Sequence, residues 1–317
     1  MAVLLGFASF AKANNFGFTH FQIAAEPIPI NYHVLAYDGK FINRKPVILF
    51  LQGSGPKPIF WKKGAQTTTP IAFSREQLRN FYFVIIRKPG MPFYADSDFK
   101  VPKIYHKLLN FNYRVKTASL VFRELLNKKW VDKKKIILVG ISEGAYLAPR
   151  VAVQNNGITH LACFLGGGLS QAYDPVFNIL NDKKHAGEHS EALLNDVEDY
   201  LQILRDINKD AESTTKFWRG HTYKMWSGFF DYSPKNDLIK LDIPIFYAVG
   251  SKDRASPFEG NIMVPVEFAR LGKKNLTFEI CRNCDHGFNE VLSDAESRFT
   301  PRFEEYTNKF FQWLNKQ

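Results

Sequence analysis

Short apolar runs alternate along the chain with segments of helical spacing, and this alternation predicts a parallel β-sheet. Continuous apolar runs at residues 46–51, 81–86 and 136–139 are typical of strands covered on both faces. Apolar residues at three- and four-residue intervals predict a helix over residues 112–127, and a shorter helix is expected over residues 74–80. The order strand, helix, strand, helix, strand favours right-handed crossovers with helices on both faces of one sheet.

The same pattern extends toward both ends of the chain. Residues 18–24 and 31–37 alternate between apolar and polar positions, so we expect two half-exposed strands that form an antiparallel edge. Further strands are expected at residues 159–165, 243–249 and 276–281, and further helices at residues 143–154, 259–271 and 302–314. The sequence therefore predicts an α/β fold with eight strands around one core.

One long region breaks the alternation. We expect no strand between residues 169 and 240, a region that we call the insertion. Residues 190–208 have the pattern of an amphipathic helix, with Ser190 as its N-cap. Aromatic residues gather directly after this helix: Phe217, Trp218, Tyr223, Trp226, Phe229, Phe230 and Tyr232. About half of these rings are expected to form the small core of the insertion itself.

Composition and charge narrow the class of protein. The chain has 317 residues, 45% of them hydrophobic and 29 of them Phe, which is enough for a sizeable buried core. The net charge of +11 raises the question of an anionic partner, but the basic residues are scattered. The one dense run, at residues 128–135, is expected to include a solvated linker at residues 133–135, so we expect no nucleic-acid binding.

The amino terminus leaves two interpretations open. Residues 2–10 are apolar and Ala11-Lys12-Ala13 matches the small-x-small pattern of signal-peptide cleavage, although no basic residue precedes the apolar run. If residues 1–13 are a signal peptide, the mature chain begins near Asn14 and is periplasmic or secreted; otherwise the protein is cytoplasmic. No other stretch approaches the roughly 20 apolar residues of a membrane span, so no integral membrane segment is expected.

Three cysteines are too few for a disulfide framework. Cys281 and Cys284 form a C-x-x-C pair directly after the expected strand at residues 276–281, and Cys163 is the remaining thiol. A zinc or redox centre would call for a second pair or a helix opening at the motif. Two free cysteines or one local disulfide therefore rank ahead of a metal or redox site.

The candidate chemistry starts at the strand over residues 136–139. Gly140 and Gly144 flank Ser142 in a G-x-S-x-G pattern between this strand and the next helix. A serine on such a sharp turn needs neighbours without side chains, because the two backbones approach closely there. This pattern, in this order of elements, resembles the nucleophile elbow of the α/β-hydrolase family.

The resemblance implies an α/β-hydrolase fold with a central, mostly parallel eight-stranded sheet and helices on both faces. It implies a single domain over residues 14–317, with the insertion as a helical cap whose aromatic rings close over the substrate. A serine hydroxyl needs a base, and that base needs an orienting acid. In this family the acid and the histidine follow the serine in that order, which assigns Asp253 and His286 to the triad with Ser142. Asp285 adjoins the histidine and is poorly placed to reach its ring.

The family also stabilises an oxyanion with two backbone N–H groups. One is expected from Glu143, directly after the serine, and the other from Gly53 or Ser54, in the loop after the third strand. Gln52 stands where the family often has histidine, so both loop residues remain candidates. The side chain of Glu143 is expected to contact substrate or make a local hydrogen bond. Arg87 and Lys88 would attract an anionic substrate if they face the pocket, although such residues more often face solvent.

Three functions stay open on these residues. A serine hydrolase that cleaves a carboxylic ester through an acyl-enzyme ranks first, with a small-molecule ester as substrate. A serine peptidase acting on short peptides or aminoacyl amides ranks second, and acidic anchors for a free amine in the cap would favour it. A non-catalytic binding protein on the same scaffold ranks third, since fold alone guarantees no activity. None of these readings implies a cofactor or a metal, and none fixes the oligomeric state.

Overall fold

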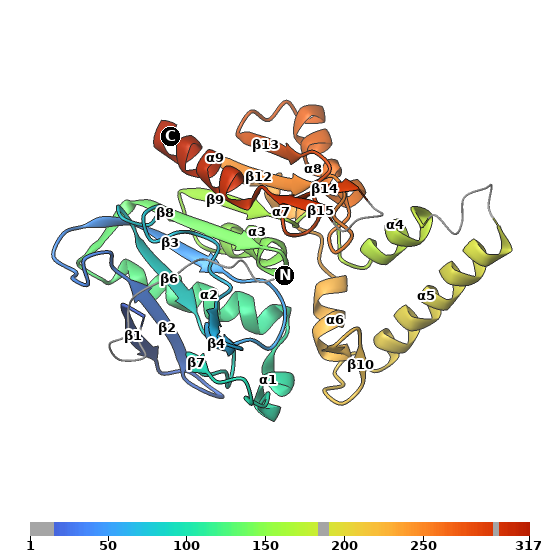
Figure 1. Cartoon of the computed structure of the whole chain (residues 1–317), viewed down its shortest axis with the longest axis horizontal. Helices are drawn as coiled ribbons and strands as arrows, with labels where there is room; N and C mark the ends of the chain where they lie inside the picture. The colour runs from blue at the N-terminus through green and yellow to red at the C-terminus, as the bar shows by residue number, and fades with distance from the viewer. Residues whose placement is uncertain (1–15, 183–189, 294–297) are drawn as a thin grey trace.

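A computed structural model of the chain describes residues 16–182, 190–293 and 298–317 (Figure 1). The proposed signal peptide at residues 1–13 lies outside the described residues, so it stays a prediction. None of the described helices combines the length and the apolarity needed to cross a lipid bilayer.

The centre of the molecule is one eight-stranded sheet with the order β1-β2-β6-β3-β8-β9-β12-β13. Its strands are β1 (Phe18–Ile23), β2 (Ile30–Leu35), β6 (Tyr82–Ile86), β3 (Lys45–Leu51), β8 (Val131–Ile141), β9 (His160–Phe164), β12 (Ile245–Gly250) and β13 (Leu276–Cys281). The β1–β2 and β2–β6 pairs are antiparallel, and the remaining pairs are parallel. The predicted eight strands and the antiparallel edge are therefore confirmed.

Both faces of the sheet are buried, which explains the continuous apolar runs. In β3, Val47 and Leu49 belong to one buried cluster, whereas Ile48 and Phe50 belong to another on the opposite face. The first cluster packs against α2 (Phe111–Leu126), α3 (Glu143–Gln154) and α8 (Phe258–Arg270), and the second against α9 (Phe303–Lys316). The helices predicted at these four places are confirmed, and they cover both faces (Figure 1).

Two local predictions are wrong. Residues 133–135 are not a linker but part of β8, which begins at Val131 because that residue pairs with Lys45 of β3. Lys133 and Lys134 are exposed and lie where the register of β8 shifts between Val131 and Ile136, and the N–H of Lys134 donates to Oδ1 of Asp132 at 3.0 Å. Residues 74–80 form turns rather than a helix. Ser74 and Gln77 exchange capping hydrogen bonds, but the chain enters β6 before a second turn can follow.

Several short elements were not predicted. They are a three-stranded sheet of β4 (Phe60–Lys63), β5 (Gln66–Thr68) and β7 (Tyr94–Ala95), the helix α1 (Lys103–Leu108), and a hairpin of β14 (Asn289–Ser293) and β15 (Arg298–Pro301). Strands of two to five residues are too short for an alternating pattern to stand out from the sequence. The first of these sheets matters for function, because it carries Trp61 to the site described below.

The insertion is mostly helical, as predicted. Its elements are α4 (Asp174–Leu180), α5 (Glu191–Lys209), the hairpin β10 (Phe217–Trp218) and β11 (His221–Thr222), α6 (Tyr223–Phe230) and α7 (Lys235–Leu238). The two-residue strands correct the expectation of no strand in this region. Ser190 caps α5 by accepting the N–H of Leu193 at 3.2 Å. Figure 1 shows α4 and α5 extending away from the central sheet.

The closest packing in the sheet occurs where β3 and β8 meet the start of α3. A Cβ atom added to Gly144 would lie 1.9 Å from the carbonyl oxygen of Leu51, and one added to Gly140 would lie 2.2 Å from the carbonyl oxygen of Gly144. Both contacts are with backbone, which cannot move aside as a side chain can. Glycine at these two positions is therefore a steric requirement of the fold.

We expect Gly144→Ala to lower the free energy of unfolding by about 1–3 kcal/mol or more, as overpacked cores do. Denaturant unfolding followed by circular dichroism measures this loss. Gly260→Ala is the matched control, because the nearest contacts of its Cβ in helix α8 would be side-chain atoms at ordinary distances, the ring of Phe177 at 3.4 Å and Oδ1 of Asp174 at 3.8 Å. Alanine in a helix is favoured over glycine by up to about 1 kcal/mol, so the control should be neutral or stabilising. Equal unfolding curves for the two variants would contradict the steric argument.

Candidate active site

Ser142 lies on a strained turn between β8 and α3. Its backbone has φ 55° and ψ −123°, a conformation that is rare for a residue with a side chain. Strain of this kind costs about 1–3 kcal/mol and persists only where the surroundings enforce it. Here the N–H of Ser142 donates to the carbonyl of Phe164 in β9 at 2.9 Å, and the Ser142 carbonyl accepts from the N–H of Ala145 at 2.8 Å. These two bonds hold the serine above the edge of the sheet.

The structure brings the three predicted triad residues together. The Oγ atom of Ser142 lies 2.9 Å from Nε2 of His286, and Nδ1 of His286 lies 2.7 Å from Oδ2 of Asp253. They come from the carboxyl ends of β8, β12 and β13, which meet at one edge because these strands are parallel. Asp253 is buried, and its other oxygen accepts the N–H groups of Ala255 and Ser256 at 2.8 and 2.9 Å. With Asp253 accepting at Nδ1–H, Nε2 is left to accept the serine proton.

Among the described residues, no hydrogen bond or ion pair joins the Asp285 side chain to the imidazole, in keeping with the expectation from its position. Its Oδ1 atom accepts the N–H groups of Gly287 and Asn289 at 2.7 and 2.9 Å. The carboxylate thereby shapes the loop that carries His286.

Gly53 and Ser54 lie beside Ser142. A Cβ atom on Gly53 would stand 3.2 Å from Cβ of Ser142, so the loop after β3 runs directly against the serine. The N–H of Glu143, at the start of α3, is one of the unbonded donors that every helix has at its first turn. Within the described part of the chain, the N–H groups of Gly53, Ser54 and Glu143 donate to no other backbone or side-chain acceptor. All three candidate oxyanion donors are therefore free for a ligand.

The side chain of Glu143 points into the protein. It is buried and forms an ion pair with Arg114 of α2, whose Nη2 atom also donates to the carbonyl of Gln52 at 2.7 Å. Burial lowers the pKa of Arg114 to about 10. Of the two roles expected for the Glu143 carboxylate, the local interaction is the one observed.

The position of Lys88 differs from the sequence-based prediction. Its side chain faces neither solvent nor the substrate pocket. It is buried, and Nζ donates to the carbonyls of Gly53 and Gly55 at 2.6 and 2.7 Å. Burial, with help from the nearby charges of Arg114 and Lys57, holds its pKa well below the ordinary lysine value. For a lysine two residues after a buried strand, the sequence does not indicate whether the amine faces solvent or the interior.

A cavity of about 240 Å³ opens over the serine and the histidine. It is lined by Gln52, Gly53, Ser54, Lys57, Trp61, Thr69, Pro70, Ala72, Ile141, Ser142, Leu165, His286, Gly287 and Phe303. None of the seven insertion aromatics is among these residues, so the expectation that they close over the substrate is not met by the described residues. Phe229 and Tyr232 instead pack on Phe111 of α2, and the rings of the cavity are those of Trp61 and Phe303.

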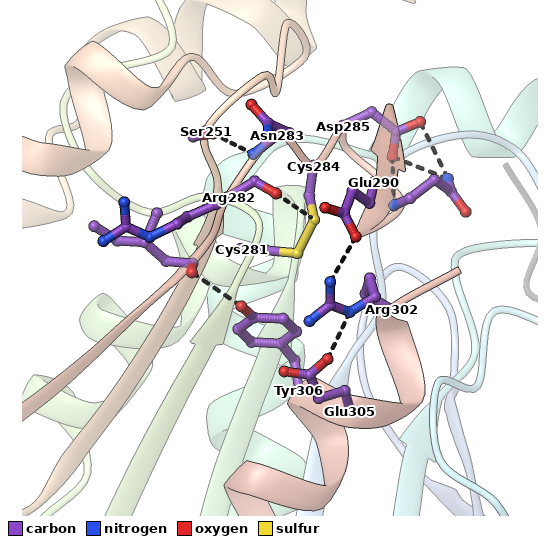
Figure 2. The surroundings of a disulfide bond; sticks show 12 residues. Ser251, Cys281, Arg282, Asn283, Cys284, Asp285, Glu290, Arg302, Glu305 and Tyr306 are labelled. Carbon is purple, nitrogen blue, oxygen red and sulfur yellow. Dashed lines mark hydrogen bonds and ion pairs between the residues drawn. A yellow bond between two sulfur atoms is a disulfide. The ribbon is translucent and has the colours of Figure 1, made fainter. Parts of the chain in front are cut away.

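A disulfide closes the turn that precedes the histidine loop (Figure 2). Of the alternatives left open by the sequence, Cys281 and Cys284 form the local disulfide, with Cα atoms 5.4 Å apart, while Cys163 is free and buried. The carbonyls of the two bonded cysteines accept the N–H groups of Ser251 and Lys252 at 3.0 and 2.8 Å. The disulfide thus closes the turn before His286, and these two backbone hydrogen bonds join that turn to the loop that carries Asp253.

A second buried network lies behind the acid. The hydroxyl of Tyr146 donates to Asp174 at 2.9 Å and lies 2.8 Å from Oγ of Ser256, whose N–H binds Asp253. Burial, together with the charge of Asp253, raises the pKa of Asp174 well above the ordinary carboxyl value. Asp174 begins helix α4, so this network joins the insertion to the acid loop.

No family model matches the chain, and no curated protein matches its sequence. Among solved structures, acylaminoacyl peptidase of Pyrococcus horikoshii superposes with a TM-score of 0.58 at 16% identity. That match covers 93% of this chain and 41% of the peptidase, so this chain spans less than half of that protein.

Two shorter proteins match over nearly their whole length. Est1E of Butyrivibrio proteoclasticus has a TM-score of 0.52 at 11% identity, and the match covers 94% of this chain and 98% of that one. The alpha/beta hydrolase GrgF of Penicillium sp. sh18 has a TM-score of 0.56 at 10% identity, with 94% and 98% covered. At such identities the likeness establishes a shared fold.

The disulfide should stabilise the protein chiefly by restricting the unfolded chain. For a loop this short, the chain-entropy relation gives a contribution of about 2 kcal/mol. We expect a Cys281→Ser/Cys284→Ser variant to unfold at lower denaturant concentration than the wild type. Adding a reductant during unfolding should shift the wild type toward the variant and leave the variant unchanged. A Cys163→Ala variant serves as thiol control, and its unfolding should respond to reductant as that of the wild type does. If reductant does not change the unfolding of the wild type, the disulfide does not contribute to the free energy of unfolding.

Asp174 should make stability depend on pH. Its folded pKa is raised, so the folded state holds the proton more tightly than the unfolded chain. The stabilisation is complete below the unfolded value, near pH 4, and is lost as pH rises through the folded pKa. Asp174→Asn keeps the shape but cannot ionise, so its stability relative to wild type should increase with pH over this window.

Urea unfolding in a buffer series from pH 4 upward measures this difference. Asp242→Asn is the control, because the side chain of Asp242 is 94% exposed. The control should keep a nearly constant offset from the wild type. A constant offset for Asp174→Asn as well would show that Asp174 does not titrate as argued.

Proposed function

We propose that this chain, which has the α/β-hydrolase fold, is a serine hydrolase that cleaves a carboxylic ester through an acyl-enzyme. The observation that carries the proposal is the continuous hydrogen-bonded series from Ser142 through His286 to the buried Asp253. A serine alone is a weak nucleophile at neutral pH, and this series is the arrangement that activates it.

In the proposed reaction, Nε2 of His286 accepts the proton of Ser142 as Oγ attacks the ester carbonyl. Asp253 holds the imidazole in the tautomer that can accept this proton and stabilises the imidazolium that forms. The tetrahedral intermediate collapses when His286 donates the proton to the leaving alcohol, which leaves the acyl group on Ser142. A water molecule, activated by His286 in the same way, then releases the acid and restores the serine.

The oxyanion of each tetrahedral intermediate needs donors that are already in place. We assign the N–H of Glu143 as one donor and an N–H from Gly53 or Ser54 as the other. The proposal is supported by the position of the loop against Ser142 and by the absence of another acceptor for these groups among the described residues.

The lining of the cavity favours an ester over an aminoacyl amide. A peptidase that binds a free amino terminus needs a carboxylate to pair with the ammonium group. No Asp or Glu is among the described residues that line the cavity, where Lys57 is the lysine of the lining. Trp61 and Phe303 add apolar ring surface, so a small ester with an apolar or aromatic group fits this site better than a peptide with a free amine.

The test is active-site labelling with a fluorophosphonate probe, followed by turnover assays on acyl esters and aminoacyl amides. We expect the wild type to be labelled and Ser142→Ala to be unlabelled, with ester turnover reduced by a factor on the order of 10⁴ to 10⁶. Ser213→Ala, a serine of the insertion that does not line the cavity, is the control and should be labelled like the wild type.

Each other outcome has a clear meaning. An unlabelled wild type favours the non-catalytic binding protein. Labelling that persists in Ser142→Ala moves the nucleophile to another residue. Turnover of aminoacyl amides ahead of esters supports the peptidase.

A further inference from the structure

We propose that Lys88 is a positioning residue of the oxyanion hole: it fixes the peptide group between Gly53 and Ser54 so that the N–H of Ser54 faces the reacting carbonyl. This inference rests on the proposed hydrolase function and deepens it. It accounts for the orientation of the Ser54 N–H, one of the two loop donors that the sequence left open.

The contacts of Lys88 are confined to this loop. The residue follows β6, and its side chain is only 5% exposed. Its Nζ atom donates to the carbonyls of Gly53 and Gly55, at 2.6 and 2.7 Å, and pairs with no carboxylate among the described residues. Burying an amine without a counterion costs free energy. The two hydrogen bonds to the loop carbonyls are the interactions that offset this cost, so Lys88 acts on the conformation of the loop.

Peptide geometry turns these bonds into an orientation of the N–H group. A trans peptide is planar, and its N–H points opposite to its C=O. Among the described residues the cis bond is the one between Glu26 and Pro27, so the Gly53–Ser54 peptide is trans. With the Gly53 carbonyl directed at the buried Lys88, the N–H of Ser54 points to the other side of the loop. Gly53 and Ser54 border the cavity over Ser142, which places that N–H toward the site.

Gly55 lets one amine hold two carbonyls. Its φ of +89° lies in the left-handed region, which turns the chain so that the carbonyls of residues 53 and 55 converge on Nζ. A Cβ atom at Gly55 would meet nothing within 4 Å. Glycine is therefore favoured here by backbone conformation and not by lack of space.

Arg114 orients the preceding peptide group, between Gln52 and Gly53, by the same kind of hydrogen bond. It donates to the carbonyl of Gln52 at 2.7 Å, so the N–H of Gly53 also points away from the interior. Its other side-chain nitrogen pairs with the carboxylate of Glu143, whose own N–H is the donor from the helix. Two buried basic side chains thus hold the loop in register with the start of α3, before any substrate binds.

The hydrogen bonds of Lys88 do not depend on its charge. A neutral amine keeps two N–H donors, which is the number of carbonyls that it binds. The lowered pKa of Lys88 is therefore compatible with the positioning role in either protonation state.

Lys88→Met tests the inference, because methionine fills a similar space without a donor. We expect kcat for an ester to fall about tenfold to hundredfold, somewhat less than the loss of an entire oxyanion donor, while KM changes little. Affinity for a trifluoromethyl ketone, whose hemiketal oxyanion occupies the hole, should fall by the same factor as kcat/KM. A purely structural role would lower stability without this parallel loss.

Lys135→Met is the matched control. Its Nζ atom also donates to a backbone carbonyl, that of Leu314 at 2.7 Å, but from the opposite end of β8. The control should lose stability and keep the kinetic constants and the ketone affinity of the wild type. If Lys88→Met behaves as Lys135→Met does, the inference is wrong.

A second variant covers the case in which Lys88→Met does not fold. Gly55→Ala adds no clash but disfavours the left-handed turn that aligns the two carbonyls. It should lower kcat/KM and ketone affinity together, and unchanged values would overturn the inference. A wild type that neither reacts with the fluorophosphonate nor cleaves esters refutes the proposed function itself. If the wild type is active and both variants keep its kcat/KM and ketone affinity, only the role of Lys88 is refuted.

Discussion

The site depends on one steric constraint, the contact of three backbones where β3, β8 and the start of α3 meet. Gly140 and Gly144 leave no room for a Cβ atom, and the Leu51 carbonyl lies against the helix start. This packing forces the chain through a sharp turn at Ser142, whose strained backbone presents the hydroxyl above the sheet edge. The same packing brings the loop after β3 beside Ser142, so the candidate nucleophile and the candidate oxyanion donors are positioned by one contact.

Around this contact the protein buries three ionisable side chains, those of Lys88, Arg114 and Glu143. Arg114 and Lys88 lie beneath the loop, with one carboxylate, that of Glu143, as partner of the arginine. Buried ionisable groups rarely add net stability, since desolvation offsets most of the interaction energy. Their bonds to the carbonyls of Gln52, Gly53 and Gly55 instead fix the direction of successive peptides. Preorganised dipoles of this kind are what oxyanion stabilisation requires, because donors that must reorient lose much of their effect.

His286 and Asp253 are held by a separate set of bonds. The disulfide between Cys281 and Cys284 closes the turn before His286 (Figure 2), and the carbonyls of both cysteines accept backbone N–H groups from the loop that carries Asp253. Behind Asp253, the Tyr146–Asp174 network joins that loop to the first helix of the insertion. The insertion is therefore linked through α4 to the loop that carries Asp253, while its aromatic rings pack on α2 and on one another.

Sequence alone determined the features that follow from local pattern and chain order. Apolar runs predicted the inner strands of the sheet, because strands buried on both faces must be continuously apolar, and alternating positions predicted the two strands of the antiparallel edge. The G-x-S-x-G turn marked Ser142, and the family order of the elements pointed to Asp253 and His286. Tertiary structure decided what depends on contacts between distant segments: the buried direction of Lys88, the partner of Glu143, and the rings that line the cavity. A side chain can leave its backbone toward solvent or toward the interior, and only the packing of the neighbouring elements selects between the two.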